Sequence, residues 1–108
     1  MEKIFGKWIQ TEGQAYAGLW FDFEEDGTFT AEYAPLGVVS SGTYEINGQN
    51  IDMDQKKHTF GLLGRFKGIY QIENDELKLS LASGAGHDRP SDFSAARIYK
   101  KEKEQVTV

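Results

Sequence analysis

Arg97 and Tyr99, near the carboxyl end of the chain, are the residues best suited to binding a small acid. They stand two positions apart in the alternating segment FSAARIYKK, so both side chains point to the same side of a β-strand. Arginine presents two parallel N–H groups to a carboxylate, which is the donor that an acid needs among apolar side chains. A structural interpretation competes with this one: Arg97 covers Trp8, in the segment FGKW, and Tyr99 fills space near a barrel mouth.

Catalytic chemistry is only weakly indicated. The two histidines, His58 and His87, fall in different predicted loops, and the neighbouring Asp88 could orient His87 as a base. The sequence contains no serine-nucleophile elbow, zinc-protease, phosphate-loop or kinase motif, and it contains no cysteine. We therefore predict no catalytic residue, no metal site and no cofactor. A small lyase or isomerase that uses His58 or His87 is kept as a third alternative.

The charge of the chain bears on its partners. The 108 residues carry a formal net charge of −5, although Lys56, Lys57, Arg65 and Lys67 form a local basic cluster. Because overall acidity repels phosphate backbones and anionic lipid surfaces, we predict neither a nucleic-acid partner nor a membrane partner. No apolar run is long enough for a signal peptide or a membrane span, so a native start at Met1 predicts a cytoplasmic protein.

Short alternating runs separated by turn residues make up most of the chain, which predicts antiparallel β-structure. The Asp-Gly pair in EEDG, between GLWFDF and TFTAEY, is a strong hairpin signal. Segments 42–53 and 68–79 repeat one strand–turn–strand pattern, which predicts two similar hairpins of a β-meander. The predicted strands lie at approximately 5–11, 16–23, 28–34, 39–46, 50–55, 64–72, 76–82 and 93–101.

The predicted fold class is all-β: an antiparallel up-and-down β-barrel of about eight strands. An open sheet of sequential strands has two unpaired edges that invite aggregation, and closing the sheet removes both. A two-sheet sandwich is the alternative, because alternation alone does not show closure. We expect residues 1–102 to form a single barrel domain and residues 103–108 to be a frayed carboxyl-terminal tail.

A closed barrel places the last strand beside the first, and this brings Arg97 toward Trp8. An arginine side chain readily lies over an indole, with a cation–π energy of roughly 0.5–2 kcal/mol. We therefore predict a structural plug at one end of the barrel, made of Gly6, Trp8 and Arg97.

The pattern Gly6-x-Trp8 on the first strand, with Arg97 on the last, resembles the calycin superfamily of lipocalins, fatty-acid-binding proteins and avidins. In that superfamily an arginine from the final strand covers a tryptophan on the first. The motifs DGTF, the paired GxYxI hairpins and RPSDF also resemble bacterial lipocalin-like domains of uncharacterised function. The resemblance implies a lipocalin-like or calycin-like barrel.

The segments FGKW and RIYKK resemble the two ends of intracellular fatty-acid-binding proteins. In those proteins an arginine and a tyrosine two residues apart help to hold the ligand carboxylate, and the matching residues here are Arg97 and Tyr99. Those proteins also have ten strands and a helical lid between the first two strands. Only a short segment separates the first two predicted strands here, so the lid is missing.

The predicted function is non-enzymatic binding of a small apolar ligand, with or without a carboxylate, inside the barrel. A barrel of this size that contains many inward-facing rings has room for one small ligand at most. The predicted ligand contacts are Arg97, Tyr99, Tyr44, Tyr70, Phe21 and Phe29.

The alternative function is that of a ligand-free packed barrel acting as a homo-oligomeric or protein-interaction module. Its predicted interface is an outward-facing apolar strip on the last, first and second strands, and apolar patches of this kind tend to mark interfaces. The strip consists of Ile9, Trp20 and Ile98, and a homodimer through it is the expected assembly.

Overall fold

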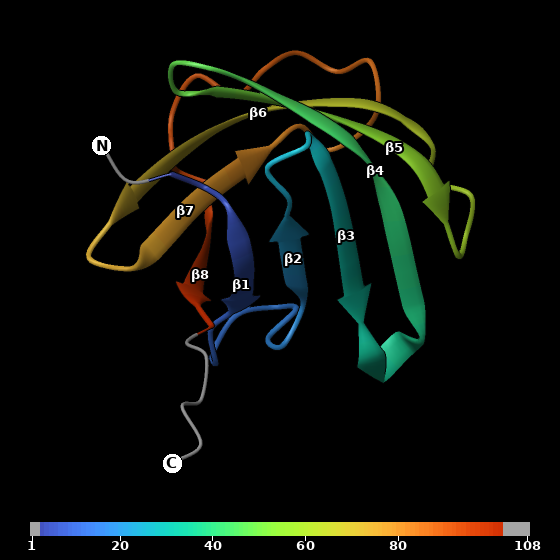
Figure 1. Ribbon diagram of the computed structural model, residues 1–108, viewed down its shortest axis with the longest axis horizontal. Coiled ribbons are helices and arrows are strands. Elements are labelled where there is room, and N and C mark those ends of the chain that lie inside the picture. The colour runs from blue at the N-terminus through green and yellow to red at the C-terminus, as the bar shows by residue number, and fades with distance from the viewer. Residues whose placement is uncertain (1–2, 103–108) are drawn as a thin grey trace.

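The computed structural model describes residues 3–102, in which eight β-strands form one closed antiparallel barrel (Figure 1). Each strand pairs with the next along the chain, and the last strand pairs with the first. The predicted up-and-down barrel is therefore confirmed, and the sandwich alternative is wrong. The strands are β1 (Gly6–Gln10), β2 (Trp20–Phe23), β3 (Thr28–Tyr33), β4 (Val38–Asn47), β5 (Asn50–His58), β6 (Gly64–Glu73), β7 (Glu76–Leu81) and β8 (Arg97–Lys101).

The connections follow from local turn chemistry. The helical element of the described chain is one 3₁₀ turn, η1 (Ala34–Leu36), between β3 and β4. The two repeated segments form the β4–β5 and β6–β7 hairpins, as the sequence predicts. In the second hairpin Asn74 and Asp75 both have positive φ, of 53° and 60°, which is the backbone of a tight hairpin turn that follows the strand twist. The predicted tail, 103–108, lies outside the described residues.

The two ends of the barrel differ, and we name them by their connections. The closed end carries the β2–β3, β4–β5 and β6–β7 turns, together with residues 4 and 5. The open end carries the segments 11–19, 34–37, 59–63 and 82–96. Because neighbouring strands alternate in direction, residues such as Phe29, Tyr44 and Ile51 lie near the closed end, whereas Tyr33, Val38 and His58 lie near the open end.

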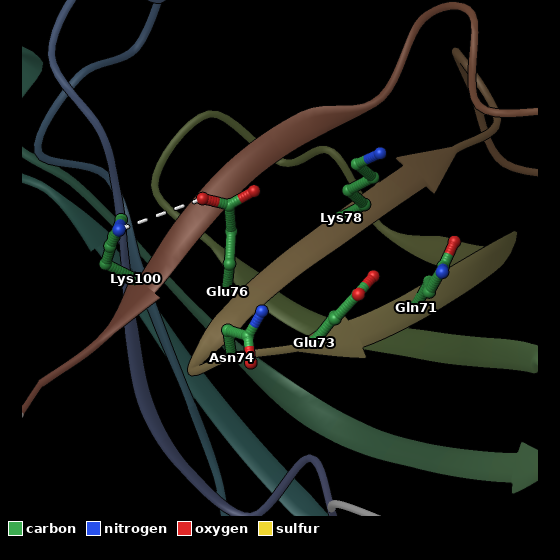
Figure 2. Close-up of a pocket in the computed structure, with 6 residues that line it drawn as sticks. All are labelled: Gln71, Glu73, Asn74, Glu76, Lys78 and Lys100. Carbon is green, nitrogen blue, oxygen red and sulfur yellow. Dashed lines mark ion pairs between the residues drawn. The ribbon is translucent and has the colours of Figure 1, made fainter.

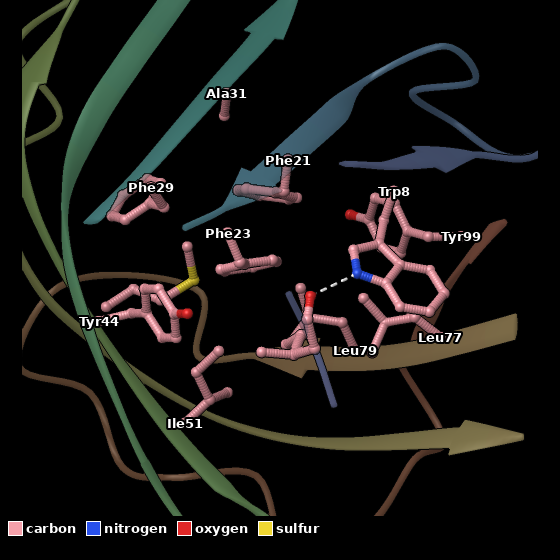
Figure 3. Close-up of a cluster of buried hydrophobic side chains, with 12 residues drawn as sticks. Trp8, Phe21, Phe23, Phe29, Ala31, Tyr44, Ile51, Leu77, Leu79 and Tyr99 are labelled. Carbon is pink, nitrogen blue, oxygen red and sulfur yellow. Dashed lines mark hydrogen bonds between the residues drawn. The ribbon is translucent and has the colours of Figure 1, made fainter. Parts of the chain in front are cut away.

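Trp8 is the largest side chain buried at the closed end, and it is 1% exposed. Its indole Nε1 donates a 2.7 Å hydrogen bond to the carbonyl oxygen of Ile4, so the polar atom of the ring is satisfied (Figure 3). The aromatic ring of Phe23 packs edge-on against Tyr44, with 5.0 Å between the ring centroids. The Tyr44 hydroxyl donates a 2.6 Å hydrogen bond to the carbonyl oxygen of Glu24, which ties the core to the β2–β3 turn.

The cation over Trp8 is Lys101, and the prediction that Arg97 covers this ring is wrong. The β1–β8 register pairs Trp8 with Lys101 and Gln10 with Tyr99. The Nζ of Lys101 lies 4.7 Å from the centroid of the Trp8 ring, and it donates a hydrogen bond to the carbonyl oxygen of Phe5. Arg97 is four residues away from the partner of Trp8, so it reaches the open end instead.

Gly6 makes room for Lys101. A Cβ at position 6 would lie 2.7 Å from the Nζ of Lys101, and the backbone of Gly6 has a φ of +108°. The pattern Gly6-x-Trp8 thus lets a lysine side chain cross the bare backbone and lie on the indole.

Candidate functional site

An apolar pocket of about 300 Å³ lies at the open end of the barrel. Its floor is formed by Phe21 and Ala31, which face each other across β2 and β3. Behind Phe21 the aromatic core begins, because its ring centroid lies 5.7 Å from that of Phe23 and 5.7 Å from that of Tyr99. The remaining lining residues are Tyr16, Leu19, Tyr33, Leu36, Val38, Ser40, Gln55, His58, Phe60 and Leu62.

Small side chains leave this space empty. Ala31 pairs with Phe21 on one side and with Ser40 of β4 on the other, so two of the three neighbouring inward positions carry few atoms. Nearer the closed end the next inward pair of β2 and β3 is Phe23 and Phe29, and the ring of Tyr44 packs against Phe23, so aromatic rings fill the barrel there (Figure 3). The pocket therefore follows from where the sequence places its small inward residues.

The rim of the pocket is apolar and exposed. Phe60 is 65% exposed and Leu62 is 58% exposed, and the exposed Leu36 of η1 lines the same pocket. The 59–63 segment is held in place by Thr59, whose backbone N–H donates to the carbonyl oxygen of Val39 at 3.0 Å. The Gln55 side chain adds a bond from its Nε2 to the carbonyl oxygen of Leu62 at 2.5 Å. The rim is thus an ordered loop that presents its apolar side chains to solvent.

The longest connection of the open end leaves the pocket uncovered. Segment 82–96 crosses the outer wall of the barrel, where Nη1 of Arg89 donates to the carbonyl oxygens of Gly68 at 2.8 Å and Ile51 at 3.3 Å. Nη2 of Arg89 also pairs with Oδ1 of Asp52 at 2.7 Å. The second carboxylate oxygen of Asp52 lies 3.1 Å from Arg65. These contacts tie the segment to β5 and β6, and none of its residues lines the pocket.

Ser40 and His58 form the polar part of the pocket wall. They are direct partners across β4 and β5, and both line the pocket. The strand register shifts between Ser41 and Gly42, so that Lys57 pairs with Ser41 and Gln55 with Gly42. The extra residue reverses the alternation of β5, and this bulge turns His58 inward.

The bulge is also the reason why the sequence analysis missed His58 as a pocket residue. The predicted fifth strand ends at residue 55, and unbroken alternation beyond it would turn position 58 outward. Gly42 carried a signal that could have revealed the shift, because a glycine inside a strand often marks a bulge or a close backbone approach. A Cβ at position 42 would lie 1.8 Å from the carbonyl oxygen of Asp54.

The hydrogen bonds of His58 fix the role of each ring nitrogen. The backbone N–H of Phe60 donates to Nδ1 of His58 at 3.0 Å. Nδ1 is therefore an acceptor, and the neutral ring carries its proton on Nε2. The imidazole is thus a hydrogen-bond donor on the pocket wall.

Arg97 does not line the pocket and lies against an aromatic ring that does. Its guanidinium carbon is 5.6 Å from the centroid of the Tyr16 ring, and Tyr16 packs edge-on against Tyr33 with 5.6 Å between centroids. Both tyrosines line the pocket, whereas Arg97 does not. The predicted pairing of Arg97 with Tyr99 around one ligand carboxylate does not form in this pocket.

Tyr99 is part of the core. Its hydroxyl oxygen accepts a 3.1 Å hydrogen bond from Nε2 of Gln10, and burial raises the pKa of the Tyr99 phenol to about 12. Tyr44 lies at the closed end, where burial together with nearby carboxylates, Asp26 foremost, raises its pKa to about 12. Both phenols are therefore neutral at ordinary pH.

Of the predicted ligand contacts, Phe21 alone lines the pocket. Phe29 packs against Phe23 in the core, and Tyr70 is partly buried beside the same cluster. The structure thus distributes the predicted set among the pocket floor, the core and the outer rim.

The predicted interface residues lie on the outer face of the barrel. Ile9 pairs with Trp20 on β2, and Nζ of Lys7 lies 4.3 Å from the centroid of the Trp20 ring. All three residues of the strip, Ile9, Trp20 and Ile98, are half-buried. The more exposed apolar side chains Leu36, Val39, Phe60, Leu62 and Leu63 occur at the open end instead.

A second hollow, of about 210 Å³, lies on the outer surface beside the β6–β7 hairpin (Figure 2). Its side chains are polar or charged and come from β6, β7 and β8 and from Asn74 in the β6–β7 turn. Lys100 and Glu76 pair across it at 3.8 Å. Because it lacks an apolar wall, this groove is a weaker candidate than the pocket.

His87, the other histidine, lies on the 82–96 segment. Its Nδ1 is 3.1 Å from the hydroxyl oxygen of Ser83, and both residues are exposed. Within residues 3–102, no group of three or more histidine and acidic side chains is placed to hold a metal ion. In the same range, no helix has the length and apolar character needed to cross a membrane.

The fold and the pocket together define a small antiparallel β-barrel that is packed at one end and open at the other. No family model matches the chain, and comparison with curated proteins and with solved structures finds no match either.

Proposed function

We propose that this protein binds a small apolar molecule, without catalysis, in the pocket at the open end of the barrel. The observation that carries the proposal is an open apolar space of about 300 Å³. Ligand pockets commonly measure roughly 300–1,000 Å³. An apolar cavity of about 150 Å³ takes up benzene, so a volume about twice as large suits a molecule of about two fused rings.

The rim supports the same function. Phe60, Leu62 and Leu36 hold apolar surface in water around the opening, and removing such surface from water is favourable by roughly 25 cal/mol per Å². A ligand in the pocket would cover part of this surface. It would also fill the space over Ala31 that no side chain occupies.

The calycin resemblance points in the same direction. A closed up-and-down barrel with a tryptophan on its first strand is the arrangement that the sequence shares with ligand-binding calycins. In the present proposal the ligand lies at the open end, rather than between Arg97 and Tyr99. Such a protein would act as a lipocalin-like carrier or sensor of a small molecule.

Titration with N-phenyl-1-naphthylamine tests this proposal. This neutral dye fluoresces strongly in apolar surroundings, and its naphthalene ring has the size of the pocket. We expect saturable binding of one dye per chain. Substituting Ala31→Phe should abolish binding, because the added ring would occupy the space above the pocket floor.

Two further variants control for damage to the fold. Ala95→Phe adds the same ring to an exposed position of segment 82–96, and it should leave dye binding unchanged. Ala31→Leu adds fewer atoms and should weaken binding without abolishing it. The proposal is wrong if the natural sequence fails to bind the dye, or if folded Ala31→Phe binds it as well as the natural sequence does.

One observation favours a second function, that of a protein-interaction module. Leu36, Phe60, Leu62 and Leu63 are exposed together at the open end, and exposed apolar patches tend to mark interfaces. A dimer could form through the rim or through the predicted strip, and sedimentation distinguishes the two. Leu62→Lys would dissociate a dimer formed through the rim, and Trp20→Lys would dissociate one formed through the strip. A monomer that binds the dye excludes both.

A further inference from the structure

We infer that the ligand of the open-end pocket is neutral and carries a hydrogen-bond acceptor, such as a carbonyl oxygen, that faces Ser40 and His58. This inference rests on the proposed function and specifies the chemistry of its ligand. The sequence predicted a ligand carboxylate bound by Arg97. Here the ligand group is an uncharged acceptor, and its donors are Ser40 and His58 on the pocket wall.

The first step concerns charge. None of the described residues that line the pocket is a lysine, arginine, aspartate or glutamate. Arg97, whose guanidinium carbon lies 5.6 Å from the centroid of the Tyr16 ring, does not line the pocket and is exposed to solvent. A carboxylate placed between Phe21 and Ala31 would lose its water without gaining a cation, which is strongly unfavourable. The pocket therefore selects uncharged molecules.

The second step concerns His58. Because its Nδ1 accepts the N–H of Phe60, the proton of the neutral ring is on Nε2, and this N–H group is the one left to bind a ligand. In this tautomer the imidazole can donate one hydrogen bond, from Nε2, to a molecule in the pocket.

The third step concerns Ser40. Ser40 is 6% exposed, and it lines the pocket. A serine hydroxyl rotates to suit its surroundings and can donate one hydrogen bond, so it can bond to an acceptor placed beside it in the pocket. Because directly opposite residues of antiparallel strands have Cβ atoms about 4.5–5.5 Å apart, Ser40 and His58 can bind the same acceptor.

Three naphthalenes of nearly equal shape test the inference by displacing N-phenyl-1-naphthylamine. They are 2-acetylnaphthalene, which has a neutral carbonyl, 2-isopropenylnaphthalene, which replaces that carbonyl with an alkene, and 2-naphthoate, which is charged. We expect the ketone to bind about tenfold more tightly than the alkene, as one net hydrogen bond provides, and the carboxylate to bind most weakly.

Variants assign the effect to the two donors. Ser40→Ala and His58→Phe should each move the ketone-to-alkene affinity ratio toward one. Ser41→Ala, on the outer face of the same strand, and His87→Phe, on the 82–96 segment, should leave this ratio unchanged. Circular dichroism tests whether each variant is folded. If His58→Phe does not fold, Ser40→Ala still tests the inference.

The outcomes separate this inference from the proposed function. Equal binding of ketone and alkene overturns the inference, and so does an unchanged ratio in folded Ser40→Ala and His58→Phe, while dye binding still supports an apolar pocket. If 2-naphthoate binds most tightly and Arg97→Ala weakens it, the head-group site is the one that the sequence predicted. Failure of every probe overturns the proposed function itself.

Discussion

The two ends of this barrel are built from the same eight strands, yet one end is packed and the other is open. At the closed end Trp8 is 1% exposed and its indole N–H is bonded to the backbone. At the open end Phe60 is 65% exposed, and a pocket of about 300 Å³ lies between the strands. The difference lies in the size of the inward side chains. We therefore expect the closed end to supply most of the stability, and the proposed ligand site lies at the open end.

Removing one aromatic ring from each end tests this division most directly. Trp8→Ala should lower the free energy of unfolding by about 3–5 kcal/mol, because it leaves a cavity in the core. Phe60→Ala should change it by less than about 0.5 kcal/mol, because the ring is largely in water, while weakening dye binding. Urea unfolding followed by circular dichroism measures both effects.

The comparison fails if Phe60→Ala destabilises the barrel as strongly as Trp8→Ala does. That result would mean that the rim contributes to the core. A second informative result is unchanged dye binding in Phe60→Ala, which would show that the rim takes no part in the site.

Alkaline unfolding tests the boundary between the two ends, where Tyr99 lies behind the pocket floor. Burial raises the pKa of Tyr99 to about 12, from the ordinary tyrosine value of about 10. A raised pKa means that the stabilisation is fully present below pH 10 and is lost as the pH rises through 12. At about 1.4 kcal/mol for each pKa unit, the loss approaches about 3 kcal/mol.

Tyr99→Phe removes this titrating group while keeping the ring. The free energy of unfolding of the variant should therefore fall less between pH 10 and pH 12 than that of the natural sequence. Tyr16→Phe, which alters an exposed ring at the rim, serves as the matched control and should leave the alkaline loss unchanged. Equal losses in the natural sequence and in Tyr99→Phe would contradict the assignment.

The sequence predicted the strands and their order because both depend on local features. Alternation in TFTAEY, and the repeated hairpins with their polar turns, are readable without knowledge of the fold. Closure followed from the need to pair the two edge strands. These features leave open which residues of two distant strands become partners.

The plug shows that limit. Arg97, Tyr99 and Lys101 alternate on the same face of the last strand, so each was equally able to face Trp8. In the observed register, Lys101 is the residue that pairs with Trp8. In the same way, the bulge in β5 turned His58 inward, against the alternation of the residues before it. Candidate sites built on such positions depend on register, and register is a property of the closed barrel rather than of any one segment.

Two glycines of the chain provide a smaller test of the closed end. Gly6→Ala places a Cβ 2.7 Å from Lys101 Nζ, at a φ of +108°. Gly13→Ala, in the open-end segment 11–19, has a φ of +88° and meets no atom within 4 Å. Both variants carry backbone strain of about 1–3 kcal/mol, and Gly6→Ala should cost more because Lys101 must also leave Trp8.

Thermal unfolding of the two glycine variants gives the comparison. A larger loss in Gly13→Ala than in Gly6→Ala would show that the contact between Lys101 and Trp8 contributes little. That result would also remove the reason for a glycine two residues before the tryptophan.

The smallest expected effect separates the two cation–aromatic pairs, one at each end. Lys101→Met keeps much of the aliphatic stem over Trp8 but loses the charge and the bond to Phe5, which should cost about 1 kcal/mol of unfolding free energy. Arg97→Met removes a solvent-exposed guanidinium from Tyr16 and should cost at most about 0.5 kcal/mol. Because Tyr16 lines the pocket, Arg97→Met should instead be detected as a change in dye affinity. If Arg97→Met destabilised the barrel more than Lys101→Met, the arginine would be the structural cation after all. Both ends would then contribute to the free energy of unfolding.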